Sequence, residues 1–243
     1  MSDAPIYRFN RNPRFSVNHL TRYLSTTNAG QRDKIVQEAK FPRTIPVTIY
    51  GEARRAIQAF LGSGRDLAYF DVPLRKLERT ANADPEKRDE ALRCIRALRA
   101  FMDTYAAKRW ANATFSPNAV DVPLKVSGVF INVRLDCQIY ERRGDETVTG
   151  GMVLFYAQTP ESRKNIELRR RQVASTIFWA LEGGQLEAMP RLCFSFDVFG
   201  EEIVRAPDAK DRFRSDVENS CREVCLKWHT IEPPAGYDGP DWH

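Results

Sequence analysis

The chain has 243 residues, of which 42% are hydrophobic and 28% charged, an ordinary globular mixture that is long enough to bury a core. A net charge of +5 and a pI near 9.0 permit contact with nucleic acid without requiring it. No apolar run approaches the roughly 20 residues that span a bilayer, and the polar N-terminus predicts no signal peptide. Five cysteines, an odd number without a compact framework, indicate a reducing compartment. We therefore expect a cytoplasmic protein without a membrane partner.

Three short helices are predicted in the first third of the chain. In FSVNHLTRYLSTT, Val17, Leu20 and Leu24 recur at helical spacing, and Ser16 is a candidate N-cap. A second helix is predicted in AGQRDKIVQEAK, and a third in GEARRAIQAFLG, which a Gly-Ser-Gly sequence ends. We expect residues 1–80 to form an N-terminal helical lobe.

A long amphipathic helix is predicted after Asp84, with Pro85 in its first turn. Apolar side chains recur at steps of three or four residues from Leu92 to Tyr105. The opposite face carries a row of arginines, namely Arg88, Arg93, Arg96 and Arg99. Such rows are more often solvated than ligand-binding, and we favour that interpretation.

The character of the chain changes to strands after Asn118. VPLKVSGVFINV, RLDCQIYER and GGMVLFYAQ are rich in β-branched and aromatic residues, and RRGDE is a predicted hairpin turn. A helix is predicted from Pro160 to about Glu182, then strands in RLCFSFDVFG and EEIVRAP, then a helix in DAKDRFRSDVENSCREVCLKWH. This order predicts an α/β core over residues 81–230, with a mixed sheet of about five strands flanked by helices, and a loose tail over residues 231–243.

Asp136 lies in VRLDCQIY, near the start of the second predicted strand of this core. With its helix, three strands, helix and strand, the core resembles the restriction-endonuclease-like fold of the PD-(D/E)XK nucleases. In active members of that superfamily, an Asp near the start of the second strand and an acid on the third strand hold a divalent metal. A lysine two residues after that acid helps to position the attacking water. The resemblance thus implies phosphodiester cleavage with Mg²⁺ or Mn²⁺.

The third strand departs from the family's pattern. GGMVLFYAQ contains neither an acid nor a lysine, and Gln158 is its only side chain able to coordinate a metal weakly. Glu161 and Lys164 follow it, but on the predicted helix. An ordinary strand-end aspartate is an equally good interpretation of Asp136. We therefore expect a nuclease-like module that has lost its metal chemistry, needs no cofactor, and binds nucleic acid or a protein partner that acts on nucleic acid.

Three further acids keep an active enzyme open as an alternative. Asp197, Glu201 and Glu202 lie in FDVFGEEIVRAP and could complete a rearranged site with Asp136. In that case Asp136, Gln158 and Glu201 would be catalytic, and Asp136 would bind Mg²⁺ or Mn²⁺. We favour a simple hairpin, in which both glutamates face solvent, because exposed acids are common in turns.

A cluster of basic residues begins the helix after the third strand. Guanidinium groups bind phosphates in a bidentate manner and position a nucleic-acid backbone without reading its sequence. The candidates for nucleic-acid binding are Arg163, Lys164, Arg169, Arg170 and Arg171. Alternatively, this helix surface balances the charges of Glu161 and Glu167.

Cys221, Cys225 and His229 follow one another at steps of four residues and so share one helix face. With Cys193 they have the ligand types of a zinc site. One helix rarely gives three ligands to one metal, because each step of four rises about 6 Å. We favour a buried stripe, in which the cysteines pack as small hydrophobic residues beside Trp228.

The C-terminal tail leaves a protein partner open as an alternative with no nucleic-acid role. Tyr237 and Trp242 are aromatic residues in the predicted tail, and exposed aromatics of this kind would suit a protein-interaction surface. The segments from Asn18 to Leu24 and from Lys40 to Pro42 also resemble uncharacterised bacterial proteins of similar length. That second resemblance implies a bacterial origin and names no activity.

Overall fold

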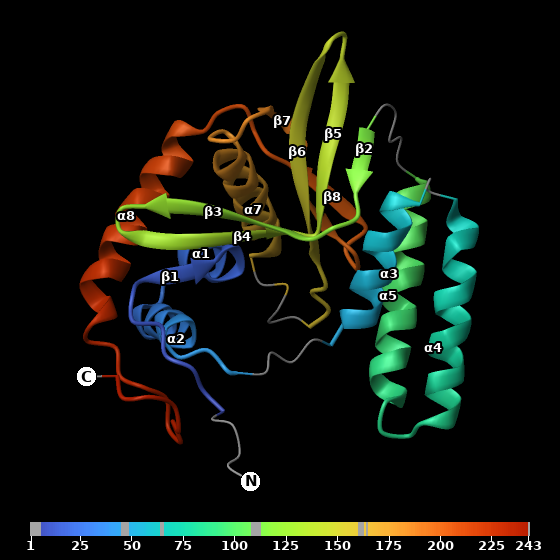
Figure 1. Cartoon of the computed structure of the whole chain (residues 1–243). Coiled ribbons are helices and arrows are strands. Elements are labelled where there is room, and N and C mark those ends of the chain that lie inside the picture. The colour runs from blue at the N-terminus through green and yellow to red at the C-terminus, as the bar shows by residue number, and fades with distance from the viewer. Residues whose placement is uncertain are drawn as a thin grey trace. The chain divides into compact units, whose positions relative to one another are not determined.

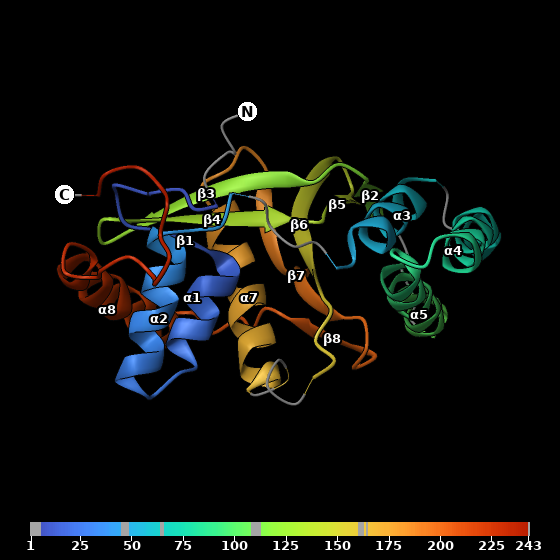
Figure 2. The ribbon, with the colours of Figure 1, turned by 90° about the horizontal axis from the view of Figure 1, so that it is seen from below.

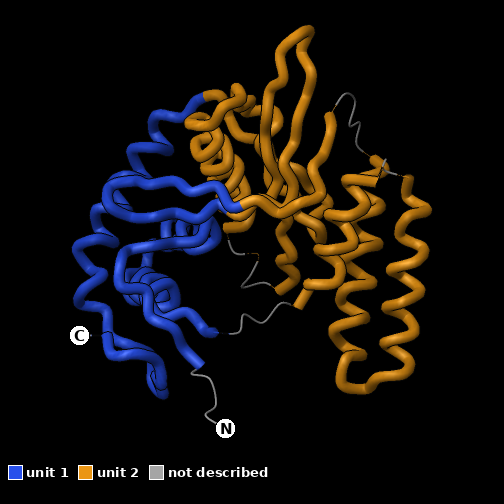
Figure 3. Tube along the Cα trace, in the orientation of Figure 1, with its two compact units in different colours: residues 1–47, 121–133, 209–243 blue, residues 48–120, 134–208 orange. Residues whose placement is uncertain are grey.

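A computed structural model of the protein describes residues 6–44, 49–63, 66–107, 113–159, 163 and 165–242. The predicted α/β class is confirmed: the described residues form seven α-helices and two mixed sheets, of five and three strands (Figure 1). The chain forms two compact units, each assembled from separate segments (Figure 3). Unit 1 contains residues 1–47, 121–133 and 209–243, and unit 2 contains residues 48–120 and 134–208. These limits do not coincide with the boundaries expected at residues 80 and 230. Among the described helices, none is long and apolar enough to cross a membrane.

Unit 1 combines three helices with most of the three-stranded sheet. Its strands follow the order β1 (Arg14–Ser16), β4 (Val129–Leu135) and β3 (Val120–Val126), and its helices are α1 (Val17–Leu24), α2 (Ala29–Lys40) and α8 (Asp211–Trp228). Ser16 caps α1 as predicted, because its Oγ accepts a hydrogen bond from the His19 amide. One correction concerns VPLKVSGVFINV, which is two strands and not one. Ser127 and Gly128 both have positive φ and turn the chain between β3 and β4.

The C-terminal segment packs against the rest of unit 1. The carboxylate of Asp238 accepts hydrogen bonds from the amides of Ile6 and Tyr7, at 2.8 and 3.1 Å. Trp242 lies 4.9 Å from Lys40 Nζ in a cation–π contact, and Tyr237 also contacts this aromatic cluster. Tyr237 and Trp242 are therefore half-buried side chains of unit 1.

Unit 2 is built on the five-stranded sheet. Its order is β2 (Ala113–Ser116), β5 (Cys137–Arg143), β6 (Glu146–Phe155), β7 (Glu187–Asp197) and β8 (Glu202–Arg205). Neighbouring strands are antiparallel except β6 and β7, which are parallel and joined through α7 (Ile166–Leu181). A parallel pair needs such a crossover, and a helix commonly provides it.

Helices cover both faces of this sheet in unit 2. The helices α3 (Gly51–Gly62) and α5 (Arg88–Ala106) pack on one face, with α4 (Asp71–Ala83) packed against α5, and α7 covers the other face (Figures 1 and 2). The predicted long amphipathic helix is confirmed as α5, although it begins at Arg88 and not at Pro85, whereas α4 was not predicted. Asp84 Oδ1 accepts hydrogen bonds from the amides of Glu86 and Lys87 and so closes the turn between α4 and α5. Pro73 in the first turn of α4 is compatible with a helix, because the amides there lack helical partners.

The strand β7 shows how side chains divide between the two faces. Phe194 and Phe196 belong to the hydrophobic core that α3, α4 and α5 share with the sheet. Ser195 and Asp197 point the other way, since Ser195 Oγ donates to the Arg170 carbonyl on α7. A buried aspartate at the end of β7 thus belongs to the α7 face.

Gly150 provides a test of this sheet. A Cβ at residue 150 would lie 2.2 Å from the Leu192 carbonyl oxygen on β7, beside a register shift between β6 and β7. We expect Gly150→Ala to lower the free energy of unfolding by about 1–3 kcal/mol, measured by urea denaturation. Gly183→Ala is the matched control, because nothing lies within 4 Å of its Cβ position. Equal stabilities of the two variants would contradict the close packing of β6 on β7.

Candidate functional site

Asp136 links β4 and β5 and is fixed to β6 by two hydrogen bonds. Its amide donates to the Met152 carbonyl, and its Oδ2 accepts from the Leu154 amide, both at 2.8 Å. The side chain is only 5% exposed. Asp136 therefore belongs to the end of the β5–β6 pair and does not project into solvent.

The helix α3 supplies the remaining partners of Asp136. Arg54 Nε lies 3.1 Å from Asp136 Oδ1, and Gln58 Nε2 lies 2.9 Å from the Asp136 carbonyl oxygen and 3.4 Å from Oδ1. Arg54 and Gln58 are four residues apart and so share one helix face. Both carboxylate oxygens of Asp136 thus have donors from the protein.

The electrostatics of Asp136 combine two opposing effects. Burial raises the pKa of its carboxyl above the ordinary value, because desolvation penalises the charged form. The Arg54 guanidinium and the Leu154 amide favour the ionised carboxylate and oppose that rise. Arg54 is 40% exposed on its side chain, so the ion pair is partly screened by water.

Two tyrosines stack beside this ion pair. The rings of Tyr50 and Tyr156 are nearly parallel, with centroids 4.7 Å apart, and the Arg54 guanidinium lies 5.5 Å from the Tyr156 centroid. The Tyr50 hydroxyl donates to Gln158 Oε1 at 2.8 Å. Gln158, proposed from the sequence as a weak ligand beside Asp136, is therefore bound to Tyr50 on the surface.

The acids after β7 form a separate cluster on the α7 face. Asp197 is fully buried, and its Oδ2 pairs with Arg170 Nη1 at 3.0 Å and Arg163 Nη1 at 3.3 Å. Glu202 pairs with Arg170 Nη2 at 2.5 Å. Asp136 meets α3 and Asp197 meets α7, so the two aspartates lie on opposite faces of the sheet.

Glu201 is exposed in the turn between β7 and β8, where its φ is 54°. Both glutamates of that hairpin reach the surface, as the simpler interpretation expected. The fold does not join Asp136, Gln158 and Glu201 in one group of contacting side chains.

The arginines predicted to bind nucleic acid already have partners in unit 2. Arg170 is 3% exposed on its side chain and bonded to two acids, and Arg163 bonds Asp197 and the Ala157 carbonyl. Arg171 is exposed and pairs with Glu167 one turn earlier. Arg169 is half-buried on the same helix. Lys164 lies outside the described residues.

The cysteines do not assemble a metal site in unit 1. Cys221 is buried, and burial raises the pKa of its thiol to about 12. Cys225 Sγ donates to the Ser127 carbonyl, and His229 is exposed. Throughout the described ranges, no three His, Cys, Asp or Glu side chains are grouped so that they could hold a metal ion.

Sequence reasoning missed Arg54, Gln58 and Tyr50 as partners of the Asp136 region. The spacing of Arg54 and Gln58 in GEARRAIQAF placed them on one helix face, but nothing in that stretch indicated that this face contacts Asp136. The contact between Gln58 and Asp136 spans 78 residues of sequence. Only the packing of α3 beside the sheet end reveals it.

Asp136→Ala tests whether this acid stabilises the fold. The variant leaves the buried Leu154 amide without its acceptor and Arg54 without its ion pair. We expect it to lose about 1–3 kcal/mol of unfolding free energy by urea denaturation without metal. Glu201→Gln in the exposed turn is the control and should stay within about 0.5 kcal/mol. A metal-free Asp136→Ala variant more stable than the parent would indicate a strained functional acid instead.

Asp197→Ala tests the cluster on the α7 face. Removing Asp197 leaves the buried Arg170 guanidinium with Glu202 alone, so we expect a loss of about 3–5 kcal/mol in the same assay. The control is Glu167→Ala, which breaks the exposed i,i+4 pair with Arg171 and should change stability by less than about 0.5 kcal/mol. Similar losses in both variants would show that the Asp197 cluster is solvated.

No model of a known protein family matches this sequence, and no curated protein does. The residues around Asp136 and Asp197 therefore carry the inference of function.

Proposed function

We propose that this chain is a nuclease-like module without metal catalysis that binds nucleic acid. The observation that carries the proposal is the set of hydrogen-bond and ion-pair partners of the Asp136 carboxylate. In the restriction-endonuclease-like interpretation this residue is the metal-binding aspartate, yet its carboxylate is bonded to Arg54, Gln58 and Leu154. The Arg54 guanidinium supplies the positive charge that a metal ion would bring.

The topology of unit 2 supports the nuclease-like part of the proposal. The elements α5, β2, β5, β6, α7 and β7 follow the order of helix, three strands, helix and strand. The strands β3 and β4 are inserted between the first and second strands of that series. Asp136 directly precedes β5, the second strand, which is where the family places its first acid.

The side chains of β6 support the loss of catalysis. Leu154 lies level with Asp136, and Tyr156 follows two residues later, at the spacing of the family's acid and lysine. Leucine cannot bind Mg²⁺, which prefers oxygen ligands. Burial raises the pKa of the Tyr156 phenol, so this group stays protonated and is a poor ligand at neutral pH.

The charge of the chain supports nucleic acid as the ligand. The net charge is +5, and 28 of the 37 basic residues are arginines. A guanidinium group offers a planar fork that binds phosphate oxygens. Contacts between arginine and phosphate position the nucleic-acid backbone, and the affinity that they provide falls as the salt concentration rises.

Binding and cleavage can be tested together. We expect the purified protein to bind labelled duplex or single-stranded DNA or RNA at low salt, by fluorescence anisotropy, with affinity that falls steeply as salt is raised. Mn²⁺ should neither tighten binding nor cause cleavage. No binding to any probe would contradict the proposal and favour a protein partner. Mn²⁺-dependent cleavage that Asp136→Ala abolishes would show that the active-nuclease alternative is correct.

A further inference from the structure

We propose that the arginine row of α5, defined as Arg93, Arg96 and Arg99, is the surface that binds the sugar–phosphate backbone. This inference rests on the proposed function and deepens it, because the arginines of α7 are largely engaged with acids. It also replaces the interpretation of the row as a merely solvated helix face.

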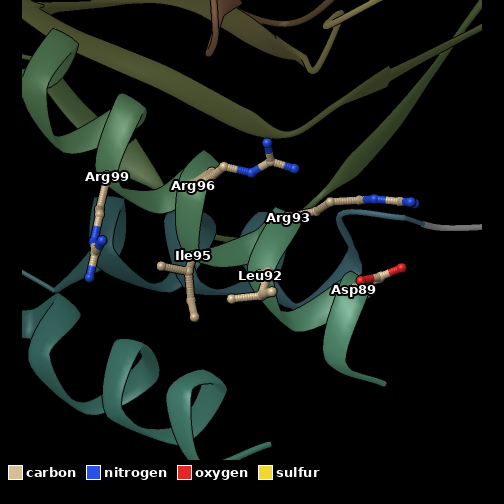
Figure 4. A pocket seen from close by; sticks show the side chains of 6 residues that line it. All are labelled: Asp89, Leu92, Arg93, Ile95, Arg96 and Arg99. Atoms are coloured by element: carbon tan, nitrogen blue, oxygen red, sulfur yellow. The ribbon is translucent and has the colours of Figure 1, made fainter. Parts of the chain in front are cut away.

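The row lies in a depression on the surface of α5. The depression has a volume of about 500 Å³ and is lined by Asp89, Leu92, Arg93, Ile95, Arg96 and Arg99 (Figure 4). Figure 4 shows Arg93 and Arg96 extending to one side of the helix, whereas Leu92 and Ile95 point to another. Leu92 is 42% exposed, so an apolar surface lies beside the cationic one.

The charges of this row are less neutralised than those of α7. In the part of the chain that the structure describes, neither Arg93 nor Arg96 has a carboxylate at ion-pair distance. Arg99 pairs with Glu78 at 3.3 Å, but its side chain is 63% exposed, and such surface pairs are weak. Asp89 is the one acid of the lining.

The first part of the row lies beside Tyr50 within unit 2, because Cys94 Sγ of α5 donates to the Ile49 carbonyl at 3.7 Å. Arg93 and Arg96 also oppose the rise in the pKa of the Tyr50 hydroxyl that burial causes. Tyr50 in turn stacks on Tyr156, beside the partly exposed Arg54. A bound strand could therefore contact the row and the inactivated acid site together.

The chemistry of the row favours phosphate over a protein carboxylate surface. Its cationic groups are all guanidinium groups, which bind phosphate oxygens through two parallel hydrogen bonds. Successive arginines three residues apart rise by roughly 4.5 Å along the helix, so they can reach different phosphates of one strand. Such contacts carry no base information, so we expect binding that tolerates any sequence.

Charge reversal tests the row against a matched surface. Arg93→Glu/Arg96→Glu should weaken binding to a short labelled duplex or single strand by about tenfold or more, and reduce the salt slope by about two. The control, Arg75→Glu/Arg79→Glu, makes the same charge change on the exposed surface of α4 and should weaken binding by less than about threefold. Thermal unfolding of each variant checks that it folds.

Two variants with smaller changes test the row even if the charge reversal prevents folding. Arg93→Lys/Arg96→Lys preserves charge but loses the bidentate fork, so we expect an intermediate loss of affinity. Asp89→Ala removes the opposing charge and should tighten binding. Unchanged binding in all the α5 variants would overturn the inference.

The outcomes separate this inference from the function on which it rests. If the parent does not bind nucleic acid, both fail. If the parent binds and the charge reversals on α5 and α4 weaken binding equally, binding depends on the net charge of the protein and not on a particular surface. That result overturns the assignment to the α5 row and leaves the proposed function standing. Polyglutamate that competes as well as DNA, and through the same arginines, would show a general site for acidic polymers and overturn the assignment to nucleic acid.

Discussion

The carboxylate of Asp136 is the constraint on which the architecture around the candidate site depends. A buried carboxylate needs donors for its oxygens, and this one receives them from β6 and from α3. The same contacts that satisfy Asp136 therefore position α3 against the end of β5. They also occupy the carboxylate oxygens that a metal ion would require, and the proposed loss of metal chemistry rests on these contacts.

The two faces of the sheet in unit 2 follow the same logic. On one face Asp136 meets Arg54 from α3, and on the other Asp197 meets Arg170 from α7. Each pair joins the end of a strand to the helix that covers it. Arginine clusters that look like ligand-binding surfaces in the sequence thus divide into two kinds. Those on α7 largely satisfy acids of their own unit, whereas Arg93 and Arg96 on α5 have no carboxylate at ion-pair distance among the described residues.

Local patterns in the sequence were sufficient to predict many elements. Helical spacing and the Ser16 cap located α1, and the hairpin turn after Arg143 located β5 and β6. The misses were local as well. No helix was predicted over α4, whose first turn contains Pro73, and the turn at Ser127 lies inside an otherwise continuous run of strand-forming residues.

The partners of the candidate site were beyond such reasoning. Asp136 was identified from its place before a strand, but its contact with Gln58 spans 78 residues, and that of Asp197 with Arg170 spans 27. Periodicity gives the face of a helix on which a side chain lies, and not the element that the face will meet. A charged side chain can therefore be a ligand or a structural partner with the same sequence signal.

The most direct test of the central claim is a titration of the parent protein and Asp136→Asn with Mn²⁺, followed by thermal unfolding. A ligand that binds the folded state raises the unfolding temperature in proportion to its affinity. If Asp136 is a structural partner of Arg54 and Leu154, Mn²⁺ leaves the unfolding temperature of both proteins unchanged, and the variant unfolds at a lower temperature than the parent. A rise with Mn²⁺ in the parent that is absent from Asp136→Asn would contradict the account and establish Asp136 as a metal ligand.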